Sequence, residues 1–72
     1  MNEKRIVPIT TPYLTLGQLL KLVDVIGNGG EAKSFLATHE VRVNGEIDAR
    51  RGRKLYPGDE VTVLGQAFVI GR

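Results

Sequence analysis

Residues 14–30 read LTLGQLLKLVDVIGNGG, and the rest of the fold is organised around this stretch. Thr15 and Gln18 fit a capping box, in which a threonine and a glutamine three residues later satisfy backbone groups at a helix N-terminus. Apolar residues then recur at helical spacing and form one stripe: Leu16, Leu19, Leu20, Val23 and Ile26. The glycine-rich run 27–30 is expected to end this helix, because glycine readily adopts the left-handed cap conformation. An amphipathic first helix is therefore predicted.

A second, shorter helix is predicted from about Glu31 to His39. Its apolar residues, Ala32, Phe35 and Leu36, lie on one side at helical spacing. Two helices joined by a short turn form a hairpin that cannot bury both apolar stripes by itself. Another layer must therefore cover them.

Short strands after residue 40 are the predicted cover. Residues 41–43 alternate and lead into Asn-Gly at 44–45, a strong signal for a β-hairpin. A two-residue loop would mix apolar and charged residues on each face of the hairpin. A three-residue loop over 43–45 would instead pair Arg42 with Glu46, and we favour it because oppositely charged residues then face each other.

The remaining elements complete an α+β chain. The Tyr-Pro-Gly-Asp sequence at 56–59 predicts a type II turn, and two strands are predicted at 61–64 and 67–70 around a turn at Gly65-Gln66. An early segment, 5–10, contains Pro8 and is at best an edge strand. We predict a two-helix hairpin packed on a small, mainly antiparallel β-sheet, with residues 14–72 forming one domain and 1–13 an N-terminal extension or edge strand.

Composition excludes several classes of protein. Apolar residues make up 42% of the 72 residues and charged residues 25%, which is typical of a soluble globular chain, and cysteine is absent. Apolar runs are too short for a membrane span or a signal peptide, so a cytoplasmic protein is expected. The single histidine, His39, and scattered carboxylates expected at the surface suggest no catalytic triad, metal site or cofactor site. The chain is predicted not to be an enzyme, and its length leaves no room for an attached catalytic domain.

One stretch suggests binding. Residues 49–56, ARRGRKLY, contain four positive charges and no acid, so the remainder of this chain of net charge +2 sums to −2. Arginine presents a planar fork of donors that suits phosphate oxygens, whereas a solvated basic loop is the simpler alternative. Lys21 and Lys33 support a binding surface only if they share it with this loop. Backbone amides at Gly29-Gly30 are a further potential phosphate site. Composition does not distinguish RNA, DNA, acidic lipid and acidic protein as partners.

The aromatic residues argue against serial base stacking on a single strand. Phe35 and Phe68 are predicted to belong to the core, and Tyr13 and Tyr56 flank turns, where packing is the expected role.

Three motifs occur together in the order and spacing of a known family. They are Ala-Lys at 32–33, Val-Arg-Val-Asn-Gly at 41–45 and Pro-Gly-Asp at 57–59. Over residues 14–63 the chain resembles the S-four RNA-binding domain, or alpha-L motif, named after small-subunit ribosomal protein four. Its Thr-Leu-Gly-Gln start and Arg-Arg-Gly-Arg-Lys-Leu loop resemble those of stand-alone bacterial members.

The resemblance implies binding of structured RNA, ribosomal or transfer RNA. We also expect a monomer that uses no small-molecule substrate. The same resemblance suggests a ribosomal subunit as a partner and a role in ribosome assembly or quality control. Carried over by position, the RNA contacts are Lys33, Arg42, Arg50, Arg51, Arg53 and Lys54. Gly29-Gly30 departs from the Ser-Arg that many members have before the second helix. The alternative function is a small protein-interaction or assembly factor that uses the same basic surface.

These assignments predict the behaviour of a triple variant. Arg50→Ala, Arg51→Ala and Arg53→Ala together are expected to weaken RNA binding while barely changing the melting temperature.

Overall fold

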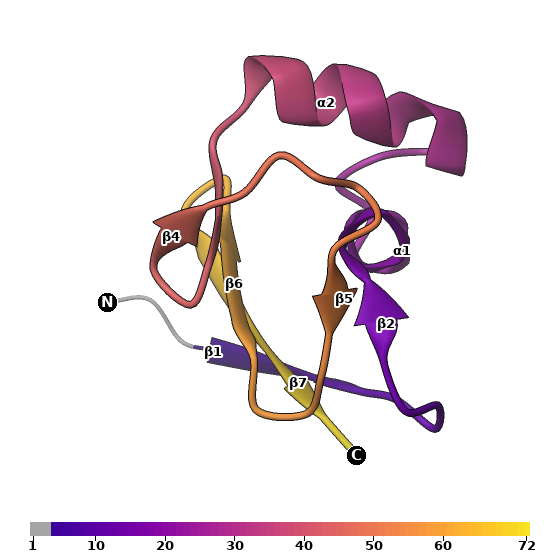
Figure 1. Cartoon of the computed structure of the whole chain (residues 1–72), viewed down its shortest axis with the longest axis vertical. Coiled ribbons are helices and arrows are strands. Elements are labelled where there is room, and N and C mark those ends of the chain that lie inside the picture. Colours follow the sequence, from indigo (N-terminus) through magenta and orange to yellow (C-terminus); the bar gives the residue numbers. More distant parts are fainter. Residues whose placement is uncertain (1–3) are drawn as a thin grey trace.

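The protein is built on a five-stranded sheet, as the computed structural model of residues 4–72 shows (Figure 1). The strands are β1 (Lys4–Pro8), β3 (Val41–Val43), β4 (Glu46–Ile47), β6 (Glu60–Val63) and β7 (Gln66–Gly71). Their order across the sheet is β1-β7-β6-β3-β4, with β1 parallel to β7 and all other neighbours antiparallel. A separate antiparallel ladder joins β2 (Leu14–Thr15) to β5 (Lys54–Leu55).

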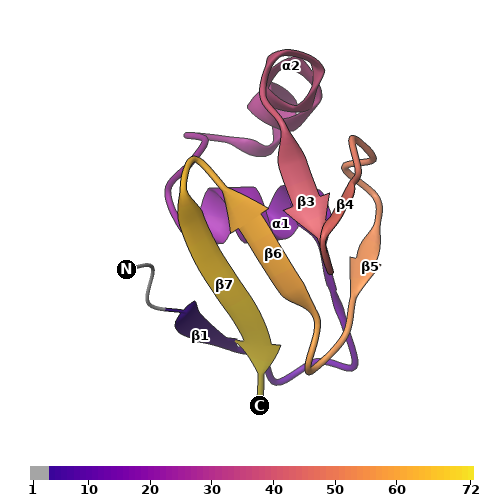
Figure 2. The ribbon, with the colours of Figure 1, turned by 90° about the vertical axis from the view of Figure 1, so that its left-hand side faces the viewer.

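Two helices pack on the sheet, one across a face and one beyond the ends of the strands (Figure 1, Figure 2). They are α1 (Leu16–Leu22) and α2 (Ala32–Thr38), and the one-turn 3₁₀ helix η1 (Gly29–Glu31) leads into α2. Figure 2 shows α1 crossing behind the sheet and α2 above it. The alternating valines of β3 and β6 pack with the leucines of α1 and with Phe68 to form the core. The predicted α+β class, with two helices and a mainly antiparallel sheet, is confirmed. No helix in residues 4–72 has the length and apolar character that a membrane span requires.

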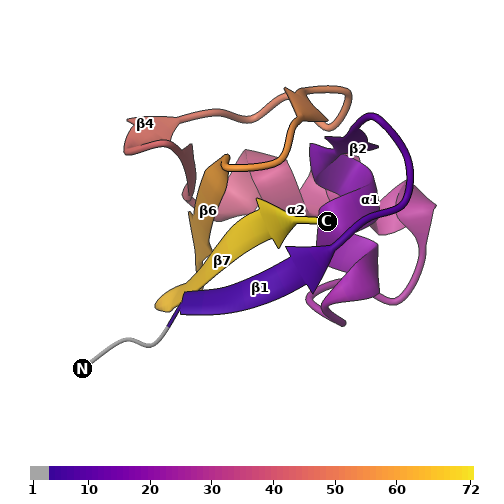
Figure 3. The ribbon, with the colours of Figure 1, turned by 90° about the horizontal axis from the view of Figure 1, so that it is seen from below.

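The predicted edge strand is confirmed as β1. Within residues 4–72 it pairs on one side only, with β7, and the two strands run next to each other in Figure 3. Pro8 is tolerated there because an edge strand has backbone groups that need no partner strand. Val7 and Ile9 on its inner side are buried in the core.

The first helix ends earlier than predicted. α1 stops at Leu22, and Asp24 adopts a left-handed conformation with φ 61°. The amides of Asp24 and Val25 donate to the carbonyls of Lys21 and Leu20, at 3.2 and 2.9 Å, which is a Schellman motif. The prediction that the glycine run ends the helix was wrong. Three β-branched residues in the last predicted turn favour helix poorly, and Ile26 still reaches the core from the loop.

The hairpin register was also predicted wrongly. β3 and β4 pair Arg42 with Ile47 and Val43 with Glu46, so the loop is the two-residue Asn44-Gly45. Both loop residues have positive φ, 53° and 86°, as a type I′ turn requires. Both residues of β4 are exposed, so no burial forces chemically matched pairs onto one face.

The two later turns differ in how well they were predicted. Gly58 has φ 97° in the expected Pro-Gly turn, whose Asp59 amide donates to the Tyr56 carbonyl at 2.9 Å. The final hairpin turns at Leu64 and Gly65, one residue earlier than predicted, and both have positive φ. This shift lengthens β7 and sets the register in which Val61 faces Phe68.

Candidate nucleic-acid interface

The basic stretch 49–56 is held against the N-terminus of α1 by backbone hydrogen bonds. The Leu16 amide donates to the Arg53 carbonyl and the Gly17 amide to the Arg51 carbonyl, each at 2.8 Å. The next amide, that of Gln18, is capped by the Thr15 hydroxyl, so the predicted capping box is confirmed. Lys54 and the residue after it pair with β2 rather than lying in the loop predicted for the whole stretch. The loop is therefore a fixed part of the helix cap.

This attachment brings two of the predicted cations together. Lys21, Arg51 and Gly17 line one surface hollow of about 400 Å³, with Thr15, Gln18 and Ala32 forming the rest of its wall. Lys21 thus shares a surface with the basic loop, which was the condition for assigning it to the site. Lys33 is exposed on α2 directly after Ala32, but it does not line the hollow.

Gly17 allows the close approach between loop and helix. A β-carbon at this position would lie 3.2 Å from the Arg51 carbonyl oxygen and 3.5 Å from the Ala32 β-carbon. We expect Gly17→Val to push the loop off α1 and to lower the free energy of unfolding by about 1–2 kcal/mol through overpacking. Amide hydrogen exchange at Leu16 should accelerate, because its bond to Arg53 weakens. Unchanged exchange and stability would show that the loop does not depend on this contact.

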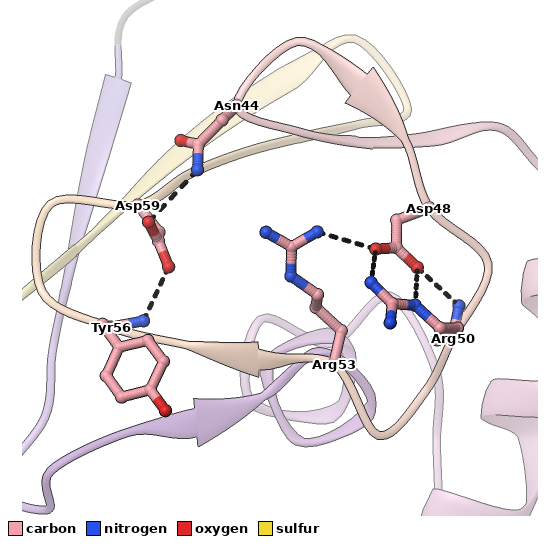
Figure 4. Close-up of polar contacts among 6 residues, drawn as sticks. All are labelled: Asn44, Asp48, Arg50, Arg53, Tyr56 and Asp59. Atoms are coloured by element: carbon pink, nitrogen blue, oxygen red, sulfur yellow. Dashed lines mark hydrogen bonds and ion pairs between the residues drawn. The ribbon is translucent and has the colours of Figure 1, made fainter.

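Asp48 is the buried centre of the basic loop. Only 8% of the residue is exposed, although the sequence indicated a surface carboxylate, so that expectation was wrong. Figure 4 shows its two oxygens accepting from both neighbouring guanidinium groups. Arg50 donates from Nε at 3.1 Å and from Nη2 at 2.8 Å, and Arg53 donates from Nη1 at 2.7 Å. The bond from Arg50, aided by Arg53 and opposed by burial, holds the pKa of the Asp48 carboxyl well below its usual range.

The ion pairs divide the predicted cations into two kinds. The Arg53 side chain is 29% exposed, and it supports the loop because it donates to the buried Asp48 carboxylate. The Arg50 side chain remains 72% exposed, so phosphate can still reach it while Asp48 orients its guanidinium group. Truncating Arg50 and Arg53 would leave the buried carboxylate with the Arg50 backbone amide, at 2.9 Å, but with no charged partner, so the triple alanine variant is no longer expected to keep its melting temperature.

Two other predicted features lie apart from this hollow. Arg42 sits on the sheet face opposite the core, where it donates to Glu40 at 3.3 Å and to the Gly45 carbonyl at 3.2 Å. The Gly29-Gly30 turn lies next to an acid, because the Glu31 carboxylate accepts from the Gly27 amide at 3.2 Å and from Asn28 Nδ2 at 3.3 Å. A carboxylate at that place opposes the binding of phosphate.

The motif residues Asn44 and Asp59 have a structural role. Asn44 Nδ2 donates to Asp59 at 3.1 Å, and the Glu60 amide donates to Asn44 Oδ1 at 2.9 Å. The other oxygen of Asp59 accepts from the Tyr56 amide at 2.8 Å (Figure 4). These bonds tie the Asn-Gly hairpin to the Pro-Gly-Asp turn, which explains why the two motifs occur together.

Two features of this region were not identified from the sequence. The spacing Asp-x-Arg-x-x-Arg over 48–53 was the signal for the buried carboxylate, since it places two arginines within reach of one acid. Tyr13 and Tyr56 come together on the surface with ring centroids 6.0 Å apart, although each was assigned to packing at its own turn. Only the β2–β5 pairing, which the sequence did not reveal, makes them neighbours.

Comparison with known proteins agrees with the motif pattern. The family model for the S4 domain matches residues 7–71. The chain is also 61% identical over 59 residues to the probable ribosome maturation protein RlbA of Bacillus subtilis (strain 168), which covers 82% of this chain and 83% of that protein. The resemblance drawn from the sequence motifs is confirmed: the chain belongs to the S4 domain family.

Proposed function

We propose that this protein binds structured RNA, with ribosomal RNA as its target, and acts without catalysis in ribosome maturation. The observation that carries the proposal is the fixed basic surface in which Lys21 and Arg51 line one hollow beside the exposed Arg50. We refer to these three cations and Lys54 as the basic surface. The Bacillus relative is named as a probable ribosome maturation protein, which favours ribosomal over transfer RNA.

The geometry of the basic surface suits recognition of an RNA backbone. Its cations come from α1, the loop 49–53 and β5, and the loop is attached to α1 by two backbone bonds, so the backbone positions that carry these cations are set before binding. Double-stranded RNA hides its bases in a deep, narrow groove and is recognised by its shape and phosphates. Preorganised cations lose little freedom on binding, so even a small surface gains affinity.

Crosslinking in cells tests the proposal against the protein-interaction alternative. Ultraviolet crosslinking of the full chain, followed by sequencing of the attached RNA, is expected to recover ribosomal RNA, and Arg51→Ala should reduce the yield. The reason is that a phosphate contact holds the RNA within crosslinking distance. Recovery of transfer RNA would overturn the choice of target. Recovery of protein partners alone, insensitive to ribonuclease, would favour the alternative function.

A further inference from the structure

We propose that Tyr13 and Tyr56 form a stacking platform for one unpaired base of the bound RNA. This inference rests on the proposed function and adds to it: the target would be a stem with an unpaired nucleotide at a fixed distance from the contacted phosphates. Aromatic side chains accept any base through its flat face, so one platform adds affinity for the unpaired nucleotide without reading its identity.

The two rings are unusual in being both paired and exposed. Tyr13 is 39% exposed and Tyr56 49%, and neither belongs to the core cluster. Their planes are inclined by 50°, so the pair is not a closed stack that uses up its own faces. Phe68, by contrast, is fully buried. An exposed tyrosine pair of this kind offers a large apolar surface to water with little conformational freedom to lose on binding.

The register of the β2–β5 ladder places the platform on the face of the basic surface. Leu14 pairs with Leu55, and both point toward the core. Because successive side chains alternate, the flanking pairs Tyr13 with Tyr56 and Thr15 with Lys54 point the other way. The backbone pairing continues past Thr15 to the bond between Gly17 and Arg51. The tyrosines, Lys54 and Arg51 therefore follow one line along the molecule.

Direct contacts support this line. Lys54 Nζ lies over the Tyr13 ring, 5.0 Å from its centroid, so this cation–π contact sets a positive charge at one face of the platform. A hollow of about 440 Å³ next to Tyr13 is also lined by Gln18, and Gln18 in turn lines the basic hollow with Lys21 and Arg51. A nucleotide on the tyrosines would thus have its phosphate near a cation, and the strand could continue toward Arg51.

Backbone contacts hold both tyrosines in place. The Tyr56 amide donates to Asp59 at 2.8 Å within the Pro-Gly turn, and the Thr11 hydroxyl donates to the Tyr13 carbonyl at 2.8 Å. The motif residue Asp59, which touches no cation of the basic surface, thereby positions an RNA-binding side chain in this proposal.

The test uses two synthetic RNA hairpins that are identical except for one bulged adenine in the stem. The chain has two tyrosines and no tryptophan, so its intrinsic emission comes from the platform itself. We expect the bulged hairpin to quench this emission and to bind about tenfold more tightly than the paired one. Tyr56→Leu and Tyr13→Leu should each remove the preference and leave affinity for the paired hairpin within about twofold, since one stacking contact is lost and the phosphate contacts remain. Tyr56→Phe should keep the preference, because it retains the ring.

Matched variants separate failure of this inference from failure of the proposed function. Ile6→Thr changes an exposed apolar residue on β1, at the edge of the sheet opposite β4 and the basic loop that follows it, and should leave both affinities unchanged. Arg51→Ala should weaken both hairpins equally. Equal wild-type affinity for the two hairpins, or equal loss for both in the tyrosine variants, overturns the platform while the basic surface stands. If neither hairpin binds the wild-type protein, the proposed function fails and the platform with it.

Discussion

Asp48→Asn is expected to lower the free energy of unfolding by about 2 kcal/mol, which for a chain of this size is a fall of roughly 10 °C in melting temperature. The substitution keeps the shape of the side chain and removes the charge that Arg50 and Arg53 share. Losing one partner of a buried ion pair can cost more. Here the exposed Arg50 can return to water, which limits the loss. Thermal and urea unfolding measure the change.

Asp24→Asn provides the matched control. It removes the same charge at an exposed position whose left-handed backbone suits asparagine as well as aspartate. We expect its stability to stay within about 0.5 kcal/mol of the wild type. If Asp48→Asn behaves like this control, the buried ion pairs do not hold the loop.

The contribution of Asp48 to the free energy of unfolding is expected to decrease as the pH falls. Its pKa is lowered in the folded protein, so the unfolded chain binds the proton more tightly and the stabilisation is complete above the unfolded pKa. It is lost as the pH falls, from about pH 5 toward pH 2. The difference in the free energy of unfolding between the wild type and Asp48→Asn should therefore become smaller as the pH falls over this range. A difference that grew in acid would contradict the assigned cause.

Lys21→Ala with Arg51→Ala is expected to weaken binding of the paired hairpin by about 30-fold, from about 1 kcal/mol for each lost phosphate contact. Both changes spare the fold. Lys21 is exposed, and Arg51 is anchored through its backbone carbonyl, which alanine retains. The melting temperature should move by no more than about 2 °C. Titration of the paired hairpin followed by fluorescence measures the affinity, and thermal unfolding of the same samples measures the melting temperature.

The control for the double variant changes net charge equally at another place. Lys4→Ala with Arg5→Ala removes two cations from β1, at the opposite edge of the sheet from β4. Lys4 pairs with Glu60 at 3.0 Å, an exposed ion pair that contributes little. We expect a loss of affinity below about threefold from the general change in charge. Equal losses in the two double variants would indicate that the RNA responds to net charge and not to the basic surface.

Much of the fold could be predicted because local and tertiary preferences agree. The capping box at Thr15, the Pro-Gly turn before Asp59 and the strands β6 and β7 depend on short-range chemistry that the sequence displays. Predictions failed where tertiary contacts determine the end of an element or the register of a strand. Ile26 looks helical by spacing, yet a Schellman turn at Asp24 brings it to the core from a loop. The register of β4 was ambiguous because neither of its residues is buried.

The candidate site, like the fold, was predictable from the sequence only in part. Residue type and spacing singled out the cations of the basic surface, but only the backbone bonds to α1 place Arg51 beside Lys21. The basic stretch 49–56 begins one residue after Asp48, so it contains no acid even though two of its arginines bind one. The exposed tyrosine pair joins Tyr13 to Tyr56, which are 43 residues apart in sequence and so lie far beyond the three- or four-residue spacings that local patterns use. No local pattern reports such a neighbour.

The salt dependence of RNA binding tests the central claim most directly. Each phosphate that a cation neutralises releases counterions, so removing one cation reduces the slope of log affinity against log salt by about one. For the paired hairpin, Lys21→Ala with Arg51→Ala should reduce the slope by about two, whereas the β1 control should leave it unchanged. An unchanged slope in the Lys21 and Arg51 variant would contradict the claim that this surface binds the RNA backbone.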